Sequence, residues 1–393
     1  MSGQHIYFVA AEASGSLLAL EVISEIRDRR PDVQISAIGG RELSAAGLVS
    51  PVDVSPLSVL GFLEGIKAYG DVVRLADAAC AEIIRAAPDV VVLVDSWGFM
   101  LRVAQRLRLA APHIRLVKLI GPQVWATRPG RARTLASTVD HLLCMYDLEG
   151  PFYEPFGLKT TVIGNPALHR GGRGDREGFR AAYKLAPEDR AILILPGSRT
   201  SEVRRVAPAM MDAARLIRKA DPQVRLFVQP AGSISEQFKA RFSADLGVFT
   251  LLEDEKARFD AMAGADVVIA CSGTVTSEVA MQGTPMAVCY KTGWMTWALA
   301  RGLLYKRTHI TLLNILNEDS PVVPEFVQTQ LKPDLIARTV SGWLQDPEAL
   351  NAQKRRQAEA LPRLIQTETP AARVAAGAIL SELAQAGRLA IET

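Results

Sequence analysis

Short apolar runs alternate along this chain with longer segments in which apolar residues recur at helical spacing. Apolar runs of about four to eight residues that are rich in valine and isoleucine indicate buried strands. The repeated order of strand and helix predicts parallel sheets built from β-α-β units. The predicted strands of the first half are Ile6–Ala10, Gln34–Ile38, Val90–Val94, Arg115–Ile120, His141–Met145 and Thr160–Ile163. Those of the second half are Ala191–Leu195, Val224–Val228, Val248–Leu251, Val267–Ala270 and Met286–Cys289.

The 393 residues exceed what one hydrophobic core usually supports, so two α/β domains are expected. A polar stretch with several glycines and arginines, from Asn165 to Gly178, is predicted to be the linker. Beyond Pro347 the composition predicts two helices, separated near Pro362 to Pro370. The predicted domains are therefore 1–168 and 169–345, both Rossmann-like, followed by C-terminal helices over 346–393.

Composition excludes several classes of protein. The 45 Lys and Arg residues nearly balance the 42 Asp and Glu residues, which does not indicate nucleic-acid binding. Four widely spaced cysteines without a C-x-x-C pair fit a reducing, cytoplasmic setting. No targeting segment is evident, and no stretch approaches the roughly 20 apolar residues of a spanning helix. Any contact with a membrane is therefore expected to be peripheral.

Ligands of doubly wound sheets bind outside the carboxyl ends of the strands, so the residues after each strand are candidates. In the first half these include Ser14 and Gly15, which precede a helix and could receive a phosphate or could only cap the helix. Asp95 follows the third strand and suits either a general base or a helix cap. The turn Gly121–Arg128 carries Trp125 and Arg128 and could be a binding loop or a structural turn.

Two turns of the second half point more clearly to an anion. Leu195–Glu202 (LPGSRTSE) follows a strand and opens a helix, so it offers backbone donors, the Ser198 hydroxyl and the Arg199 guanidinium to a diphosphate. Cys271–Glu278 (CSGTVTSE) repeats this arrangement and adds Glu278, which is expected on the first turn of its helix as an acceptor for ribose hydroxyls. Capping of the helices is the alternative interpretation of both turns.

Motifs of other enzyme classes are absent from the sequence. There is no G-x-x-x-x-G-K-[ST] phosphate loop and no G-x-G-x-x-G after the first strand, which argues against an NTPase or a dinucleotide enzyme. No H-E-x-x-H motif, cysteine–histidine cluster or D-x-D pair suggests a metal. The sequence therefore predicts a site without a metal or cofactor, in which helix termini and arginine bind the anion.

Taken together, the motifs AEASGS, IGG, SVLGFLEG, VDSWGF, GPQVWATR, LPGSRTSEV, CSGTVTSE and NILNEDSPVVPE resemble the lipid A disaccharide synthase family in order and spacing, over about residues 5–385. The resemblance implies a GT-B fold, with two Rossmann-like domains facing a central cleft. It also implies transfer of 2,3-diacylglucosamine from its UDP derivative to 2,3-diacylglucosamine 1-phosphate, with a β(1→6) linkage and release of UDP. The implied setting is the cytoplasm, at the inner face of the Gram-negative cytoplasmic membrane. The cations Lys291, Arg301 and Arg307 indicate an anionic membrane surface as partner.

The resemblance also implies residue roles. Asp95 occupies the position of the essential acid. Arg199, Glu202, Ser272, Gly273, Thr274 and Glu278 match the nucleotide-binding segments of the family. With Gly15, Gly197, Ser198 and Asn314 they form the candidate set for the nucleotide sugar. The candidate acceptor and lipid residues, chosen from the first-half loops and the apolar segment, are Ser14, Leu60, Phe62, Gln123, Trp125 and Arg128.

The chain departs from the family pattern in several loops, notably at Ser16, Met100, Gln123 and residues 317–320. These departures keep open a paralogous UDP-sugar transferase with a different lipid or sugar acceptor. A UDP-N-acetylglucosamine 2-epimerase-like enzyme, which shares the GT-B architecture, is a further alternative. A binding protein without enzymatic activity is the least favoured alternative, because the chain retains Asp95, Arg199 and Glu278.

Two apolar segments bear on the membrane. Leu57–Ile66 is unusually apolar for a surface connection, and Trp294–Lys306 combines aromatic residues with cations. Both patterns suit a membrane interface, and a buried helix with solvated ends is the competing interpretation.

Overall fold

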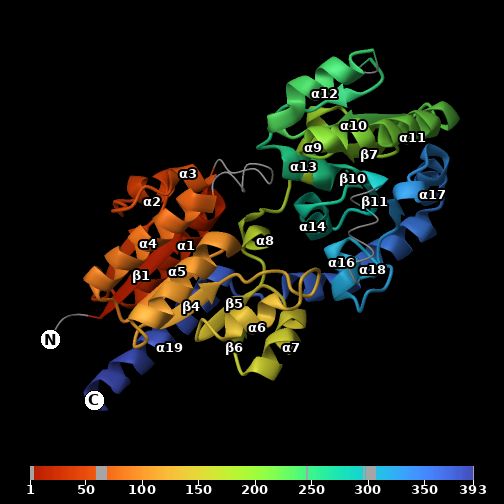
Figure 1. Cartoon of the computed structure of the whole chain (residues 1–393). Helices are drawn as coiled ribbons and strands as arrows, with labels where there is room; N and C mark the ends of the chain where they lie inside the picture. The colour runs from red at the N-terminus through yellow and green to blue at the C-terminus, as the bar shows by residue number, and fades with distance from the viewer. Residues whose placement is uncertain (1–3, 59–68, 245–246, 295–296, 298–306, 393) are drawn as a thin grey trace. The chain divides into compact units, whose positions relative to one another are not determined.

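The computed structural model of the chain describes residues 4–58, 69–244, 247–294, 297 and 307–392 (Figure 1). The chain divides into two compact units. Unit 1 contains Met1–Pro166 and Gln366–Thr393, and unit 2 contains Ala167–Ile365. The helical region expected at 346–393 is therefore shared between the units, because the chain returns to unit 1 at its end.

Unit 1 is built on a six-stranded sheet in which every pair of neighbours is parallel. Its strands are β1 (His5–Ala10), β2 (Gln34–Ile38), β3 (Val90–Val94), β4 (Arg115–Leu119), β5 (His141–Cys144) and β6 (Lys159–Val162). Their order across the sheet is β2-β1-β3-β4-β5-β6. The six strands predicted from apolar runs are confirmed, with ends that differ by about one residue.

Helices cover both faces of this sheet. The helical elements of unit 1 are α1 (Ala13–Arg29), α2 (Arg41–Ala45), α3 (Ser55–Ser58), α4 (Tyr69–Ala86), α5 (Trp97–Ala110), α6 (Arg131–Ala136), η1 (Asp147–Glu149), α7 (Gly150–Tyr153), η2 (Glu154–Phe156) and α19 (Ala371–Glu392). One apolar core lies between the sheet and α4 and α5, and the other lies between the sheet and α1 and α19. Figure 1 shows α19, in blue, beside the red and orange elements of unit 1.

Unit 2 repeats the architecture with a second six-stranded parallel sheet. Its strands are β7 (Arg190–Leu195), β8 (Val224–Val228), β9 (Thr250–Leu251), β10 (Val267–Cys271), β11 (Met286–Tyr290) and β12 (Glu325–Val327), in the order β12-β11-β10-β7-β8-β9. The sequence missed β12, because three residues with only a short apolar run give no clear strand pattern. The other five predicted strands are confirmed, although β9 is shorter than expected.

The helical elements of unit 2 are α9 (Arg176–Ala182), α10 (Thr200–Arg205), α11 (Ala207–Ala220), η3 (Gly232–Ile234), α12 (Ser235–Phe242), α13 (Arg258–Gly264), α14 (Thr274–Gln282), α16 (Leu312–Leu316), η5 (Gln328–Gln330), α17 (Pro333–Gln345) and α18 (Pro347–Ile365). A short helix, α8 (Pro166–Arg170), begins at the boundary between the units, inside the segment predicted as a linker. None of the helices among the described residues is long and apolar enough to cross a membrane.

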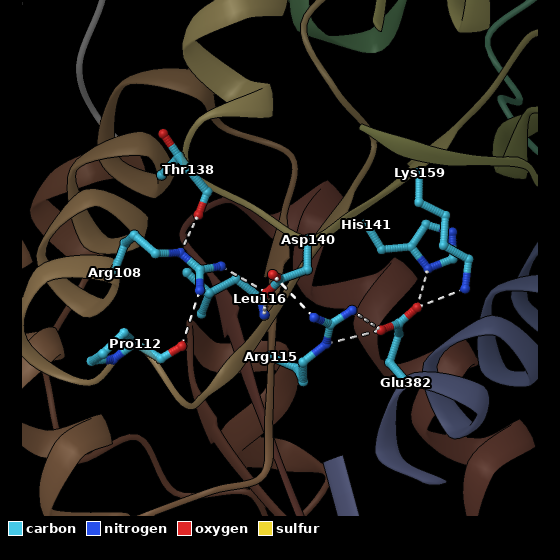
Figure 2. Close-up of polar contacts among 9 residues, drawn as sticks. All are labelled: Arg108, Pro112, Arg115, Leu116, Thr138, Asp140, His141, Lys159 and Glu382. Carbon is cyan, nitrogen blue, oxygen red and sulfur yellow. Dashed lines mark hydrogen bonds and ion pairs between the residues drawn. The ribbon is translucent and has the colours of Figure 1, made fainter. Parts of the chain in front are cut away.

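A buried carboxylate fixes α19 to unit 1 (Figure 2). Glu382 has no exposed side-chain surface and receives hydrogen bonds from Arg115 Nη2 at 2.7 Å and Lys159 Nζ at 2.8 Å. Its Oε1 also lies 3.0 Å from Nδ1 of His141. Burial alone would raise the pKa of Glu382, but His141, Lys159 and Arg115 together hold that pKa well below its ordinary value.

We expect Glu382→Gln to lower the free energy of unfolding by about 2–3 kcal/mol at pH 7, which is less than a fully buried ion pair because Arg115 and Lys159 keep contact with solvent. The wild-type advantage should be present above the ordinary glutamate pKa of about 4.3 and should shrink as the pH falls below it, because protonation removes the stabilising charge. Urea unfolding at several pH values measures both effects. The exposed Glu359→Gln serves as control, and a difference between wild type and variant that does not change with pH would contradict this account.

Candidate active site

Both sheets change direction next to their first strand. In unit 1 the chain proceeds from β1 outward to β2 and then places β3 on the other side of β1. In unit 2 it proceeds from β7 through β8 to β9 and then places β10 on the other side of β7. Loops diverge at such switch points and leave a crevice outside the carboxyl ends of the strands. The β1/β3 and β7/β10 junctions are therefore the expected sites of the two units.

A cavity of about 310 Å³ lies at the β7/β10 junction of unit 2. Its lining combines the turn after β7, the turn after β10, the end of β8 and the start of α13. The lining residues are Leu195, Gly197, Ser198, Arg199, Glu202, Gln229, Pro230, Ala231, Glu255, Arg258, Met262, Cys271, Ser272, Gly273, Thr274, Val275 and Glu278. The structure thus brings together, in one cavity, all the candidates predicted in the two anion-binding turns.

The turn after β7 is held by Glu202. Its Oε2 accepts hydrogen bonds from the backbone N–H groups of Ser198 at 2.9 Å and Arg199 at 3.2 Å. Gly197 has a φ of +107°, and a Cβ at this position would lie 2.8 Å from the Cβ of Glu202, so only glycine fits. Two of the backbone donors that the sequence assigned to a diphosphate are therefore already used within the turn. The turn still offers the Ser198 hydroxyl and the Arg199 side chain, which is 75% exposed and contacts Glu202 through Nη1.

The start of α14 provides the remaining backbone donors. Gly273 precedes the helix without a side-chain cap, and Thr276 closes the first turn by donating to the Gly273 carbonyl. Helix geometry leaves the N–H groups of Thr274 and Val275 without intrahelical acceptors, and both residues line the cavity. These donors and the positive end of the helix dipole form a site suited to an anion. No cluster of His, Cys, Asp and Glu that could hold a metal occurs among the described residues.

Glu278 lies farther along α14 than expected, because the helix begins at Thr274 and Glu278 falls in its second turn. Its Oε1 accepts a hydrogen bond from Arg258 at 2.8 Å. Gln229 also lines the cavity and donates to the carbonyl of Asp254 at 2.9 Å. Sequence reasoning missed both Arg258 and Gln229. Gln229 could have been found, since it directly follows β8, whereas Arg258 follows no strand and left no signal.

Asp95 lies at the tip of β3 in unit 1, at the β1/β3 junction. Its φ is +47° and that of Ser96 is +36°, so the chain makes a left-handed bend where the carboxylate is placed. Such strained conformations persist where surrounding contacts hold them, and they gather at functional sites. The backbone N–H of Asp95 donates to Leu119 at 2.9 Å.

A buried lysine that the sequence did not single out supports this bend. Lys118 of β4 is 2% exposed, and its Nζ donates to the carbonyls of Leu93, at 3.3 Å, and of Asp95. Burial lowers the pKa of Lys118 to about 7, although the charges of Asp95 and Glu12 oppose this shift. Lys118 therefore donates to two backbone carbonyls at the end of β3, one of which is that of Asp95, the candidate general base.

The other first-half candidates also belong to unit 1. Ser14 is exposed at the start of α1, and Gly15 is buried where a Cβ would lie 3.6 Å from Val94. In the turn after β4, Gln123 and Arg128 are exposed, whereas Trp125 is buried with its indole N–H unpaired among the described atoms. Their assignment to the acceptor stays a prediction.

Three candidates remain. Asn314 is fully buried in α16, where its carboxamide accepts from the N–H groups of Val322 and Val323 and donates to Glu325. It does not line the cavity within unit 2, and its contacts show it bracing the 322–325 segment. Leu60 and Phe62 lie outside the described residues.

Comparisons with known proteins identify the chain's relatives. A family model described as lipid-A-disaccharide synthetase matches residues 6–379. Lipid-A-disaccharide synthase of Rhodospirillum centenum is 32% identical over 379 residues, covering 96% of this chain and 94% of that protein.

Two solved structures are similar in fold. MurG of Acinetobacter baumannii has a TM-score of 0.58 at 15% identity, with 96% of this chain and 99% of that chain covered. UDP-GlcNAc 2-epimerase of Neisseria meningitidis, bound to UDP-GlcNAc, has a TM-score of 0.56 at 12% identity, with 96% and 98% covered. At such identities the likeness shows the fold alone, and it confirms the expected GT-B class.

The sequence relatives decide between the two enzyme classes, since the family model and the Rhodospirillum protein carry the name of a synthase and not of an epimerase. The chain therefore belongs to the lipid-A-disaccharide synthase family of glycosyltransferases.

Proposed function

We propose that the chain carries out the reaction of its family with UDP held in the unit 2 cavity and with Asp95 as general base. The reaction joins 2,3-diacylglucosamine, from its UDP derivative, to 2,3-diacylglucosamine 1-phosphate through a β(1→6) linkage and releases UDP. The observation that carries the proposal is the convergence, in one cavity, of the Arg199 guanidinium, the α14 N-terminus and Glu278. A diphosphate and a ribose are the chemistry that this set of groups fits.

The donor's diphosphate would be bound by the free N–H groups of Thr274 and Val275 and by Arg199. These groups balance the negative charge that grows on the β-phosphate as its bond to the anomeric carbon breaks. Glu202 would support this binding indirectly, because it accepts hydrogen bonds from Arg199 and so holds the turn in place.

The acceptor would be activated by Asp95. Its carboxylate would take the proton of the acceptor's 6-hydroxyl while the hydroxyl oxygen forms its bond to the anomeric carbon and the electron pair of the breaking bond leaves with UDP. One displacement of this kind inverts the anomeric configuration. Lys118 supports the role of Asp95 by fixing the left-handed bend on which the carboxylate is presented.

We also propose that the protein docks on a membrane surface, because its proposed substrates carry acyl chains that reside in a bilayer. An exposed aromatic ring beside a cation is the chemistry expected at such an interface. Among the described residues, Trp294, which is 62% exposed, and the nearby exposed Lys291 provide it. Leu60 and Phe62, predicted for the same role, lie outside the described part of the chain.

We expect Asp95→Asn to lower turnover by about 10²-fold or more while UDP affinity and melting temperature stay close to wild type, because the amide cannot accept the proton. Purified protein is incubated with the UDP-linked and the 1-phosphate monosaccharides, and the disaccharide is followed by mass spectrometry. Turnover of the variant within a few-fold of wild type would remove Asp95 from this role. Absence of any disaccharide with the wild type would favour a transferase with another acceptor.

Arg199→Ala should weaken UDP binding by about 1.5–3 kcal/mol, the usual range for a hydrogen bond to a charged group. Isothermal calorimetry measures this loss directly. Arg204→Ala is the matched control, because Arg204 is exposed on α10, the helix that Arg199 directly precedes, and does not line the cavity. Equal UDP affinity in Arg199→Ala and Arg204→Ala would leave the turn with a structural role only.

Lys118→Met tests the buried lysine through its proton. The pKa of Lys118 is about 7 in the folded protein and about 10.4 in an unfolded chain. Between these values the unfolded chain binds more protons, so the unfolding free energy rises with pH. We therefore expect the unfolding free energy of wild type to rise relative to that of Lys118→Met by up to about 1.4 kcal/mol per pH unit above pH 7. Urea unfolding at pH 7, 8 and 9 shows this trend, which the exposed Lys219→Met should lack; a constant difference would mean that Lys118 does not titrate there.

A further inference from the structure

The cavity of unit 2 contains an ion pair that no motif predicted. Arg258, the first residue of α13, donates from Nη2 to Oε1 of Glu278 on α14 at 2.8 Å. The guanidinium carbon lies 4.7 Å from the ring centroid of Phe259, a distance typical of cation–π contact. The arginine is thus held from two directions, and both members of the pair line the cavity.

The surroundings of Glu278 disfavour the ionised form of its carboxyl group. Burial raises the pKa of Glu278, and the charge of Arg258 opposes this rise. The other charged residues that line the cavity have partners of their own. Arg199 is paired with Glu202, and Glu255 accepts the N–H of Gly232 at 2.7 Å. Among the described residues, Arg258 is therefore the cation that counters the burial of Glu278.

The geometry of the pair leaves part of the carboxylate for a ligand. Arg258 contacts Oε1, and no described residue donates a hydrogen bond to Oε2. An ionised carboxylate only accepts hydrogen bonds, whereas a protonated one also carries a donor. Two adjacent hydroxyls that both donate are best matched by the ionised form. The ribose of a nucleoside diphosphate has such a pair of hydroxyls.

We propose that Arg258 is a positioning residue of the nucleotide site, which keeps Glu278 ionised and presents its free oxygen to the 2′- and 3′-hydroxyls of the ribose. The inference rests on the proposed function, since it assumes that the cavity binds UDP. It adds a determinant of selectivity for ribose, set by a residue that itself need not touch the sugar.

The rival interpretation is a direct contact between Arg258 and the diphosphate. A comparison of two ligands distinguishes the two interpretations. UDP and 2′,3′-dideoxy-UDP carry the same diphosphate and differ only in the hydroxyls. If Arg258 acts through Glu278, its removal weakens UDP and leaves dideoxy-UDP unchanged. If it binds phosphate, both ligands weaken equally.

The dependence on pH supplies the second readout. Without Arg258, burial acts unopposed and the pKa of Glu278 rises further, so a larger share of the carboxylate is protonated at pH 6 than in wild type. The terminal phosphate of UDP also titrates near pH 6, but it does so with every protein variant. The comparison is therefore made between variants at each pH.

Calorimetry with both ligands is carried out at pH 8 and pH 6 on wild type, Arg258→Met, Arg258→Lys and the exposed control Lys256→Met. For Arg258→Met we expect UDP affinity to fall at least three-fold more than in wild type between pH 8 and pH 6, and dideoxy-UDP affinity to follow wild type. Arg258→Lys should restore much of the wild-type behaviour, because it returns a positive charge. The double variant Arg258→Met with Glu278→Gln should lose the added dependence on pH, because glutamine does not titrate.

Two results would overturn the inference: equal pH dependence of UDP binding in wild type and Arg258→Met, or equal weakening of UDP and dideoxy-UDP. Melting temperatures of all variants at both pH values show whether a loss of affinity reflects unfolding. If the wild-type protein itself binds no UDP, the proposed function fails, and this inference fails with it.

Discussion

A parallel sheet is apolar on both faces, and both must be covered for it to be stable in water. This constraint shapes unit 1 most visibly. Helices α4 and α5 cover one face, but α1 alone covers only part of the other, and α19 completes it. The buried carboxylate of Glu382 then fixes the register of α19, because Arg115, His141 and Lys159 come from three successive strands. A helix near the end of the chain is thus bound by side chains encoded more than 200 residues earlier.

The strand order sets the position of both candidate sites, and the two sites differ in how their functional groups are held. At the β7/β10 junction, Glu202 closes the turn after β7 while the α14 terminus stays open, so one turn is rigid and the next is free to bind. At the β1/β3 junction, the backbone itself is bent at Asp95 and is supported by the amine of Lys118 from β4. The first arrangement suits an anion, and the second suits a single carboxylate held in a fixed direction.

Much of this could be predicted from the sequence, because apolar strands and the residues directly after them carry strong local signals. Eleven of the twelve strands in the described part of the chain, the position of Asp95 at a strand tip and the two turns that line the unit 2 cavity were predicted in this way. Contacts between distant segments left no such signal. Lys118 falls inside a predicted strand, Glu382 falls inside the predicted C-terminal helices and Arg258 gives no signal, since their partners become neighbours only after folding. The use of the Ser198 and Arg199 amides by Glu202 is a local contact, and it corresponds to the helix capping that the sequence offered as the alternative for this turn.

The return of α19 to unit 1 has a consequence for how the protein is made. Synthesis proceeds from the N-terminus, and domains generally fold as units as they emerge from the ribosome. The first 166 residues leave the ribosome with one apolar sheet face incompletely covered, whereas residues 167–365 emerge together with all the elements of their own unit. Unit 2 can therefore finish folding before unit 1, although it is encoded later. Until the last helix is released, the nascent chain carries an open apolar surface of the kind that chaperones bind.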